Sequence, residues 1–195
     1  MEETEFTIEN YIGEHQRIFN SLDVEAAKSA SDLIVKCIFD NKKIITCGNG
    51  GSASTASHYI TDWNKMYNLA TGDRLRGFCL ADNIGLITAY GNDVNYESVF
   101  AGQVEAIMDA GDLLVVVSGS GNSPNIISAI ESARRMGGYV VGVLGYDGGA
   151  AKSLCDDVFH VPSWDMQICE DIHLSFGHMV MKRICKTNIR PPVNL

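Results

Sequence analysis

Residues 44–59 read IITCGNGGSASTASHY: a short apolar run, a turn of glycine and serine, and then a stretch with helical character. The turn, GNGGS (48–52), contains no side chain larger than asparagine and no positive charge. Glycine lets backbone N–H groups approach an anion, serine adds hydroxyl donors, and the start of the following helix adds roughly half a positive charge. The stretch therefore predicts a strand–turn–helix unit that binds an anion without a lysine.

A second turn of the same kind, SGSGNSPN (118–125), follows another apolar run and also opens a helical stretch. Ligands of an open parallel sheet bind at the carboxyl ends of its strands, so both turns are expected to face one ligand. In the alternative interpretation, these residues only make tight turns, with Ser52 and Ser123 as helix N-caps. The presence of two such turns favours the anion site.

Two other phosphate motifs fit less well. The P-loop pattern G-x-x-x-x-G-K-[ST] is absent from the chain. A dinucleotide fingerprint is nearly present at Gly48, Gly50 and Ala53, but the acidic residue that would complete it, Asp82, comes 34 residues after Gly48. That is later than the pattern expects, and the fingerprint does not explain the second serine turn.

The same alternation of apolar and helical segments continues along the chain. Strands are expected over 44–47, 75–81, 112–119, 139–146 and 157–162, and helices over 53–67, 83–90 with 97–109, 123–136 and 165–186. Short, continuously apolar strands separated by helices indicate a parallel sheet covered on both faces. The predicted fold class is α/β: a three-layer sandwich with a five-stranded, doubly wound parallel sheet flanked by helices.

The first 40 residues show helical spacing of their apolar residues, which predicts one long helix or two helices before the sheet. We find no low-complexity segment or linker that would divide the chain. A single domain over 1–195 is therefore expected, with an N-terminal helical region (1–40), an α/β core (41–186) and a polar C-terminal tail (187–195).

Composition narrows the possible partners. A net charge of −9 over 195 residues argues against a nucleic-acid or anionic-membrane binder, which needs a basic surface. The six cysteines form no C-x-x-C pair and are typical of reduced, buried thiols. The acidic N-terminus lacks an apolar signal core, and the longest apolar runs are too short to span a bilayer. A soluble, cytoplasmic protein is expected.

Several blocks together resemble a known family: CGNGGSASTASH (47–58), YGND (90–93), VEAIMDAGDLLVVVSGSGNS (104–123), GYDGG (145–149) and EDIHLSFGH (170–178). They resemble sugar isomerase (SIS) domains and, more narrowly, the phosphoheptose isomerases, from about residue 10 to 186. The resemblance implies an aldose–ketose isomerase that converts sedoheptulose 7-phosphate to D-glycero-D-manno-heptose 7-phosphate. That step leads to nucleotide-activated heptose for lipopolysaccharide core or capsule. It also implies a homotetramer with active sites at subunit interfaces.

The resemblance also assigns roles to particular residues. Asp93 matches an aspartate that contacts the sugar, and Gln167 stands where the family usually has an aspartate. The residues expected to bind the phosphorylated sugar are Asn49, Gly50, Gly51, Ser52, Asp93, Ser118, Gly119, Ser120, Ser123 and Gln167.

Four residues resemble a family metal site that often holds zinc: His58, Asp62, Glu170 and His178. His58 and Asp62 are four apart and share a helix face, while Glu170 and His178 lie about 80° apart around a helix and can converge. Two imidazoles and two carboxylates suit one Zn²⁺ per subunit. Aldose–ketose isomerisation needs a base, an acid and an electrophile, so Asp62, Glu170 and His178 are the expected catalytic residues, with Asp62 or Glu170 as base. His173, three residues after Glu170, is an alternative partner or only a structural residue.

The reacting end departs from the family pattern. Asp62 replaces a glutamate, Glu170 replaces a glutamine, Lys65 is the nearest cation to a usual arginine, and Gly119 replaces a usual threonine. The competing hypothesis is a phosphosugar-binding regulator or a replication-initiator-associating adaptor of the same fold. Such relatives tend to lose the second histidine and to interrupt the serine loop. The presence of His178 and of SGSGNS favours the enzyme.

Overall fold

The computed structural model describes residues 6–185, so the predicted tail at 187–195 lies outside the described residues. Five parallel strands form one sheet in the order β2-β1-β3-β4-β5. They are β1 (Lys43–Gly48), β2 (Arg76–Cys79), β3 (Leu113–Ser118), β4 (Tyr139–Leu144) and β5 (Asp157–His160). The predicted class and the five strands are confirmed, although every strand except β1 is shorter than expected.

The strand order reverses between β1 and β3. From β1 the chain moves outward to β2, returns to β3 on the other side of β1, and continues to β4 and β5. Ile44 is accordingly paired with Gly77 on one side and with Leu113 on the other. A reversal of this kind opens a crevice at the carboxyl ends of the two strands, and both serine turns begin there.

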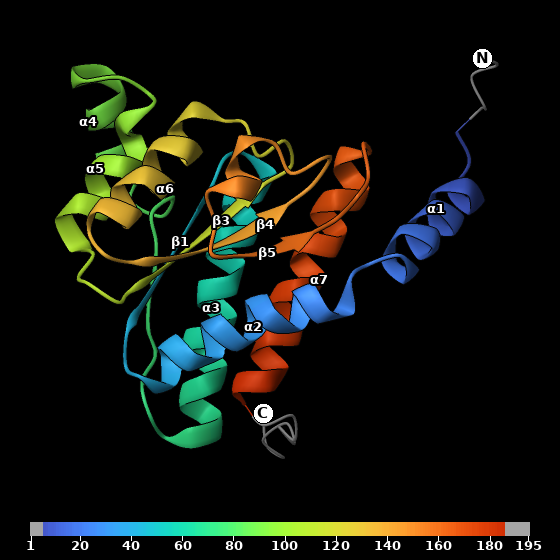
Figure 1. Ribbon diagram of the computed structural model, residues 1–195, viewed down its shortest axis with the longest axis horizontal. Helices are drawn as coiled ribbons and strands as arrows, with labels where there is room; N and C mark the ends of the chain where they lie inside the picture. Colours follow the sequence, from blue (N-terminus) through green and yellow to red (C-terminus); the bar gives the residue numbers. More distant parts are fainter. Residues whose placement is uncertain (1–5, 186–195) are drawn as a thin grey trace.

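Helices cover both faces of the sheet (Figure 1). One face is covered by α2 (Val24–Phe39), α3 (Gly51–Thr71) and α7 (Met166–Ile184). The other is covered by α4 (Ile84–Asp93), α5 (Ser98–Ile107), α6 (Pro124–Arg135) and the short 3₁₀ helix η1 (Ala150–Ser153). No helix within residues 6–185 is both long and apolar enough to cross a bilayer.

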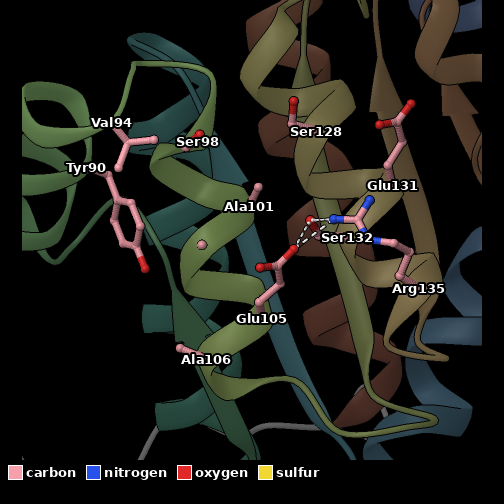
Figure 2. Close-up of a pocket in the computed structure, with 11 residues that line it drawn as sticks. Tyr90, Val94, Ser98, Ala101, Glu105, Ala106, Ser128, Glu131, Ser132 and Arg135 are labelled. Carbon is pink, nitrogen blue, oxygen red and sulfur yellow. Dashed lines mark hydrogen bonds and ion pairs between the residues drawn. The ribbon is translucent and has the colours of Figure 1, made fainter.

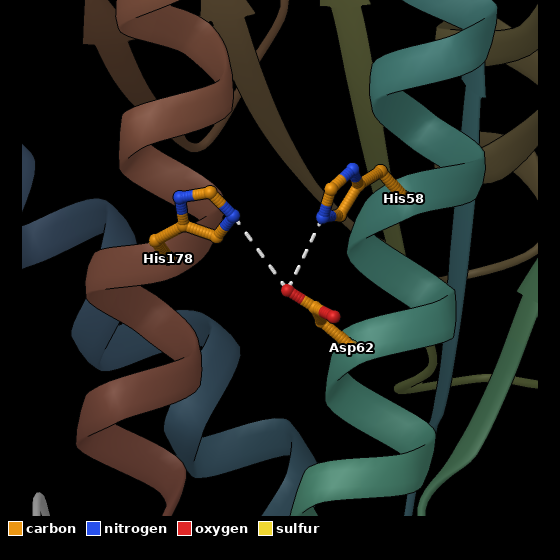
Figure 3. A group of neighbouring side chains, drawn as sticks. All are labelled: His58, Asp62 and His178. Atoms are coloured by element: carbon orange, nitrogen blue, oxygen red, sulfur yellow. Dashed lines mark ion pairs between the residues drawn. The ribbon is translucent and has the colours of Figure 1, made fainter.

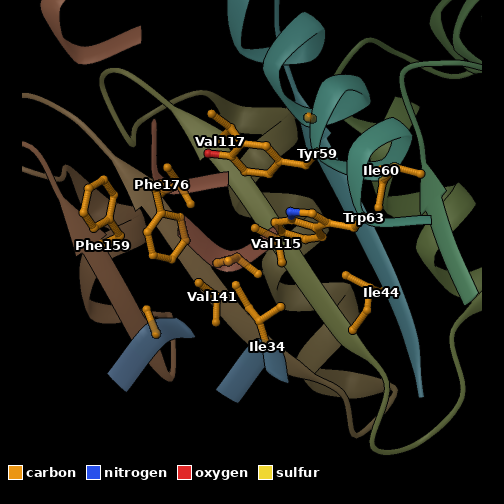
Figure 4. Close-up of a cluster of buried hydrophobic side chains, with 14 of the residues drawn as sticks. Ile34, Ile44, Tyr59, Ile60, Trp63, Val115, Val117, Val141, Phe159 and Phe176 are labelled. Carbon is orange, nitrogen blue, oxygen red and sulfur yellow. The ribbon is translucent and has the colours of Figure 1, made fainter. Parts of the chain in front are cut away.

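Alternate residues of each strand supply two separate cores. Ile44 and Leu113 point to the α2, α3 and α7 side, while Ile45 and Leu114 point to the α5 and α6 side. On the first side Trp63 is fully buried among strand side chains (Figure 4). Full burial of one aliphatic strand side chain such as Ile44 or Leu113 stabilises the folded state by roughly 1.5–3 kcal/mol. The two cores therefore hold the helices firmly on the sheet.

The N-terminal region forms two helices, α1 (Ile8–Asn20) and α2. Thr7 Oγ1 accepts the Asn10 N–H at 3.1 Å to begin α1, and Asp23 Oδ1 accepts the Ala26 N–H at 2.9 Å to begin α2. Helix α1 extends away from the sheet (Figure 1) and touches α7 where Tyr11 Oη donates to Asp171 at 2.7 Å. Ile8, Ile12 and Phe19 of this helix are exposed, as is Phe6 just before it, whereas Ile18 is buried in the core.

Candidate functional site

The predicted residues of both turns line one cavity of about 430 Å³ at the carboxyl ends of β1 and β3. We call it the serine pocket. Its lining residues are Asn49, Gly50, Gly51, Ser52, Val117, Ser118, Gly119, Ser120, Ser123, Tyr146, Met166 and Glu170. Every predicted substrate-binding residue of the two turns is thus brought to one place.

Two serine hydroxyls are oriented by their own loop. Ser118 Oγ accepts the Gly121 N–H at 3.0 Å, and Ser120 Oγ accepts the Asn122 N–H at 3.2 Å. A hydroxyl has one proton and two lone pairs, so each oxygen is fixed while its proton can still be donated to an acceptor in the pocket.

The helices that follow the turns start at the pocket. Gly50 precedes α3 with φ 54°, in the left-handed region that favours glycine, and the helix begins at Gly51. Ser52 therefore lies inside the first turn of α3 and is not its N-cap. Ser123 occupies the N-cap position of α6, but its side chain makes no capping hydrogen bond. The N-cap interpretation is therefore wrong for Ser52 and does not account for the Ser123 hydroxyl.

A reciprocal amide pair joins the two turns. Asn49 Nδ2 donates to Asn125 Oδ1, and Asn125 Nδ2 donates to Asn49 Oδ1, both at 2.9 Å. Tyr96 Oη adds a third bond, donated to Asn49 Oδ1 at 3.2 Å. The Asn49 side chain thus holds the pocket together, which is a role that the sequence interpretation did not give it.

The GYDGG segment (145–149) packs against the backbone of the second serine turn. Gly121 has φ 63°, and a Cβ atom there would lie 2.0 Å from the carbonyl oxygen of Gly148. The two residues that follow this segment are hydrogen-bonded to the turn: Ala150 N–H donates to Asn122 Oδ1 at 2.9 Å, and Ala151 N–H donates to the Gly121 carbonyl at 3.0 Å. Backbone contact this close fixes the position of the serine turn.

Charge in the pocket comes from a carboxylate. Neither lysine nor arginine is among the described residues that line it, so an anion there would be held by hydroxyls, N–H groups and helix dipoles. Glu170 lies over the start of α3, where a Cβ on Gly51 would be 2.5 Å from its Oε1. The pocket therefore pairs an anion cradle with one acidic side chain.

A second group of polar side chains lies further along α3. His58 Nε2 is 3.3 Å from Asp62 Oδ2, and His178 Nε2 of α7 is 3.6 Å from the same oxygen (Figure 3). The two imidazole rings lie edge to face, with centroids 5.3 Å apart. Asp62 thus bridges two histidines from facing helices.

This group fits a divalent metal ion. One ligand atom from each of His58, Asp62 and His178 lies within 4.8 Å of the other two. In a tetrahedral zinc site with bonds near 2.05 Å, neighbouring ligand atoms are about 3.3 Å apart, close to the separations seen here. Three protein ligands with an open fourth position are typical of catalytic zinc. Glu170, the predicted fourth ligand, is not in this group but at the serine pocket, so its ligand role stays a prediction.

Two buried hydrogen bonds between α3 and α7 hold the His58–Asp62–His178 group in position. Trp63 Nε1 donates to the Gly177 carbonyl at 2.9 Å, and Tyr59 Oη donates to the His173 carbonyl. Burial raises the pKa of Tyr59, so its phenol stays a proton donor. Because Tyr59 and Trp63 each follow a cluster residue by one position, these bonds fix α3 against α7 where His58, Asp62 and His178 meet.

Other predicted residues lie elsewhere. Asp93 is exposed at the end of α4, where it accepts a bond from Asn92 Nδ2 at 2.8 Å. Gln167 is exposed in the first turn of α7 and does not line the serine pocket. His173 is fully buried, neither ring nitrogen has a hydrogen-bond partner among the described residues, and burial lowers its pKa to about 4. This burial favours the structural interpretation of His173 over a partnership with Glu170.

The larger hollow between α4, α5 and α6, of about 610 Å³, contains none of the predicted residues (Figure 2). Arg135 Nη2 donates to Glu105 Oε1 and to Ser132 Oγ, both at 2.7 Å. Arg135, the one cation among the described residues that line the hollow, is thus already paired with a carboxylate, so the serine pocket is the better candidate for an anion.

Sequence reasoning did not assign Val117, Asn125, Tyr146 or Met166 to the serine pocket. Asn125 stood inside the quoted second turn, and its amide could have been considered a partner for Asn49. Tyr146 stood inside the quoted GYDGG block at the end of an expected strand, so a place at the carboxyl edge of the sheet could have been inferred. Met166 carried no such signal, because it reaches the pocket only through the packing of α7.

Comparisons with known proteins agree with this geometry. The SIS domain family model matches residues 10–145. The phosphoheptose isomerase of Aliarcobacter butzleri is 39% identical over 160 residues, covering 82% of this chain and 84% of the relative. A solved phosphoheptose isomerase from Neisseria gonorrhoeae superposes with a TM-score of 0.84 at 31% identity, covering 91% of this chain and 96% of the other. One from Francisella tularensis gives 0.86 at 28% identity, covering 92% and 96%. The chain therefore belongs to the SIS domain family and, within it, to the phosphoheptose isomerases.

Proposed function

We propose that the protein interconverts sedoheptulose 7-phosphate and D-glycero-D-manno-heptose 7-phosphate. The observation that carries the proposal is that the serine pocket and the His58–Asp62–His178 group lie along the same helix, α3. Ser52 and His58 are six residues apart, which is about 9 Å along the helix axis. An extended seven-carbon chain with a terminal phosphate can span that distance.

The residues of this chain divide the reaction between them. The serine hydroxyls and the N-terminus of α3 hold the phosphate. A base, Asp62 or Glu170, takes a proton from C1 beside the C2 carbonyl, and a proton is returned at C2 with His178 as the opposing acid. The O1 hydroxyl loses its proton and O2 gains one, so that C1 becomes the aldehyde carbon and C2 carries a hydroxyl. A zinc ion held by His58, Asp62 and His178 would polarise the substrate carbonyl.

The test is turnover of a panel of ketose and aldose phosphates, followed by NMR. Wild type should interconvert the seven-carbon pair. His178→Gln should lower kcat by roughly 10²- to 10⁴-fold while phosphate binding stays nearly unchanged. Ser120→Ala should instead weaken sugar-phosphate binding about 10- to 150-fold, because a hydrogen bond to a dianion is lost. Glu105→Ala, in the hollow between α5 and α6, is the control. Binding of a sugar phosphate without turnover would support the regulator instead.

We further propose a cytoplasmic homotetramer whose sites are completed at subunit interfaces. The exposed apolar residues of α1 support association, because large apolar side chains on an extended helix are stabilised by a partner surface. Light scattering should give four chains per particle. A particle that contains only one chain would contradict this assembly.

A further inference from the structure

One residue that lines the serine pocket, Tyr146, has an unusual backbone conformation. Tyr146 follows β4 by two residues and has φ 50°, a left-handed conformation that costs a residue with a Cβ atom free energy. Its N–H donates to the Ser163 carbonyl at 3.0 Å, and its own carbonyl accepts from His160 Nε2, also at 3.0 Å. Lys152 Nζ lies 3.4 Å from His160 Nδ1, which leaves Nε2 as the protonated nitrogen. The surrounding structure thus holds this conformation from both sides.

Tyr146 is one of the residues that form the wall of the serine pocket. Tyr146 lines the cavity together with Met166 and Val117. It also stacks on Trp164, with ring centroids 5.1 Å apart and planes at 25°. Trp164 is 73% exposed, although a tryptophan usually buries most of its surface. Asp165 N–H donates to Ser163 Oγ at 3.1 Å and fixes the turn that carries Trp164.

We propose that Tyr146 contacts the carbon chain next to the phosphate of the bound sugar, and that Trp164 positions the Tyr146 ring for this contact. Ligand pockets combine a few polar groups that fix orientation with apolar and aromatic walls that contact the ligand body. Here the serine turns offer donors to the phosphate, while the Tyr146 ring offers an apolar face to the C–H side of the chain. The pair therefore selects phosphates that carry a carbon chain over inorganic phosphate. The inference rests on the proposed function only for the identity of the chain.

The test compares dissociation constants for inorganic phosphate, for sedoheptulose 7-phosphate and for five- and six-carbon ketose phosphates. Tyr146→Ala should weaken sugar-phosphate binding about 3- to 10-fold while changing inorganic phosphate less than about 2-fold. Trp164→Ala should show part of this loss, and Trp164→Phe should restore it because a second ring still stacks. Phe39→Ala is the matched control, since Phe39 is also exposed and lies against a second aromatic ring, that of Tyr67. It should change neither constant.

Each outcome decides the point. Equal losses for phosphate and sugar phosphate would show that Tyr146 only supports the loop, and unchanged binding would show no contact. Wild-type protein that binds no sugar phosphate more tightly than inorganic phosphate would also overturn the inference. A five- or six-carbon phosphate that binds tightly, and is weakened by Tyr146→Ala, would support the aromatic contact while contradicting the assignment of a heptose substrate.

Discussion

Replacing Gly121 by alanine tests how the serine pocket is held in place. The new methyl group would lie 2.0 Å from the Gly148 carbonyl oxygen, at least about 1 Å inside normal contact. The positive φ of this residue adds about 1–2 kcal/mol for a side chain, and relieving the clash adds about 1–3 kcal/mol. The free energy of unfolding should therefore fall by about 2–5 kcal/mol. For a chain of this size, that lowers Tm by about 4–20 °C.

The assay is thermal unfolding combined with phosphate binding, because displacement of the turn also removes the bond from Gly121 N–H to Ser118 Oγ. Gly119→Ala is the control within the same turn. A Cβ there meets no atom within 4 Å, and its φ is not positive, so the free energy of unfolding should stay within about 0.5 kcal/mol. A Gly121→Ala protein that melts within 2 °C of wild type, or a Gly119→Ala protein equally destabilised, would refute the reasoning.

Three further predictions concern single residues. The pKa of buried His173 is about 4, below the usual 6.5, so the unfolded chain binds the extra proton and stability falls as pH drops from 6.5 toward 4. His173→Leu should remove about 1.4 kcal/mol per pH unit of this dependence, and urea midpoints with equal pH slopes would contradict it. The free energy of unfolding of Tyr146→Gly should be about 1 kcal/mol higher than that of Tyr146→Ala, because only glycine adopts φ 50° without strain. Equal melting temperatures would count against strain. After dialysis against zinc, wild type and Ser120→Ala should retain about one ion per chain, whereas His58→Ala and His178→Ala should retain less; equal retention would exclude the cluster as the metal site.

The sheet could be predicted because its strands are continuously apolar and its turns are rich in glycine and serine. Leu113 and the four residues after it are all buried, as a central parallel strand requires. The boundaries of the edge strands β2 and β5 were less certain, because such strands are short and only partly buried. The start of α3 was placed two residues late for another reason: Gly50 turns the chain by its left-handed conformation rather than by a capping side chain.

The sequence predicted which residues form the site, but not that Glu170 and His178 lie in two separate groups. Angular spacing suggested that Glu170 and His178 converge, because they lie about 80° apart around α7, yet they are also about 12 Å apart along its axis. Glu170 therefore lies at the serine pocket, while His178 faces His58 and Asp62. The left-handed conformation of Tyr146 could not be predicted, because it depends on bonds to Ser163 and His160 from a different strand and turn.

The bonds from Tyr59 and Trp63 to α7 have a consequence for how this site can evolve. They end on backbone carbonyls, which every amino acid carries, so the register of the two helices does not depend on which side chains do the chemistry. Neighbouring positions should then differ sharply in tolerance. Position 177 is closed to any side chain, because a Cβ would lie 2.1 Å from the Tyr59 ring, while position 178 projects into the open cluster. Mutational drift can exchange one ligand or proton donor for another at 58, 62 and 178, and selection can test each new chemistry on a scaffold that stays folded.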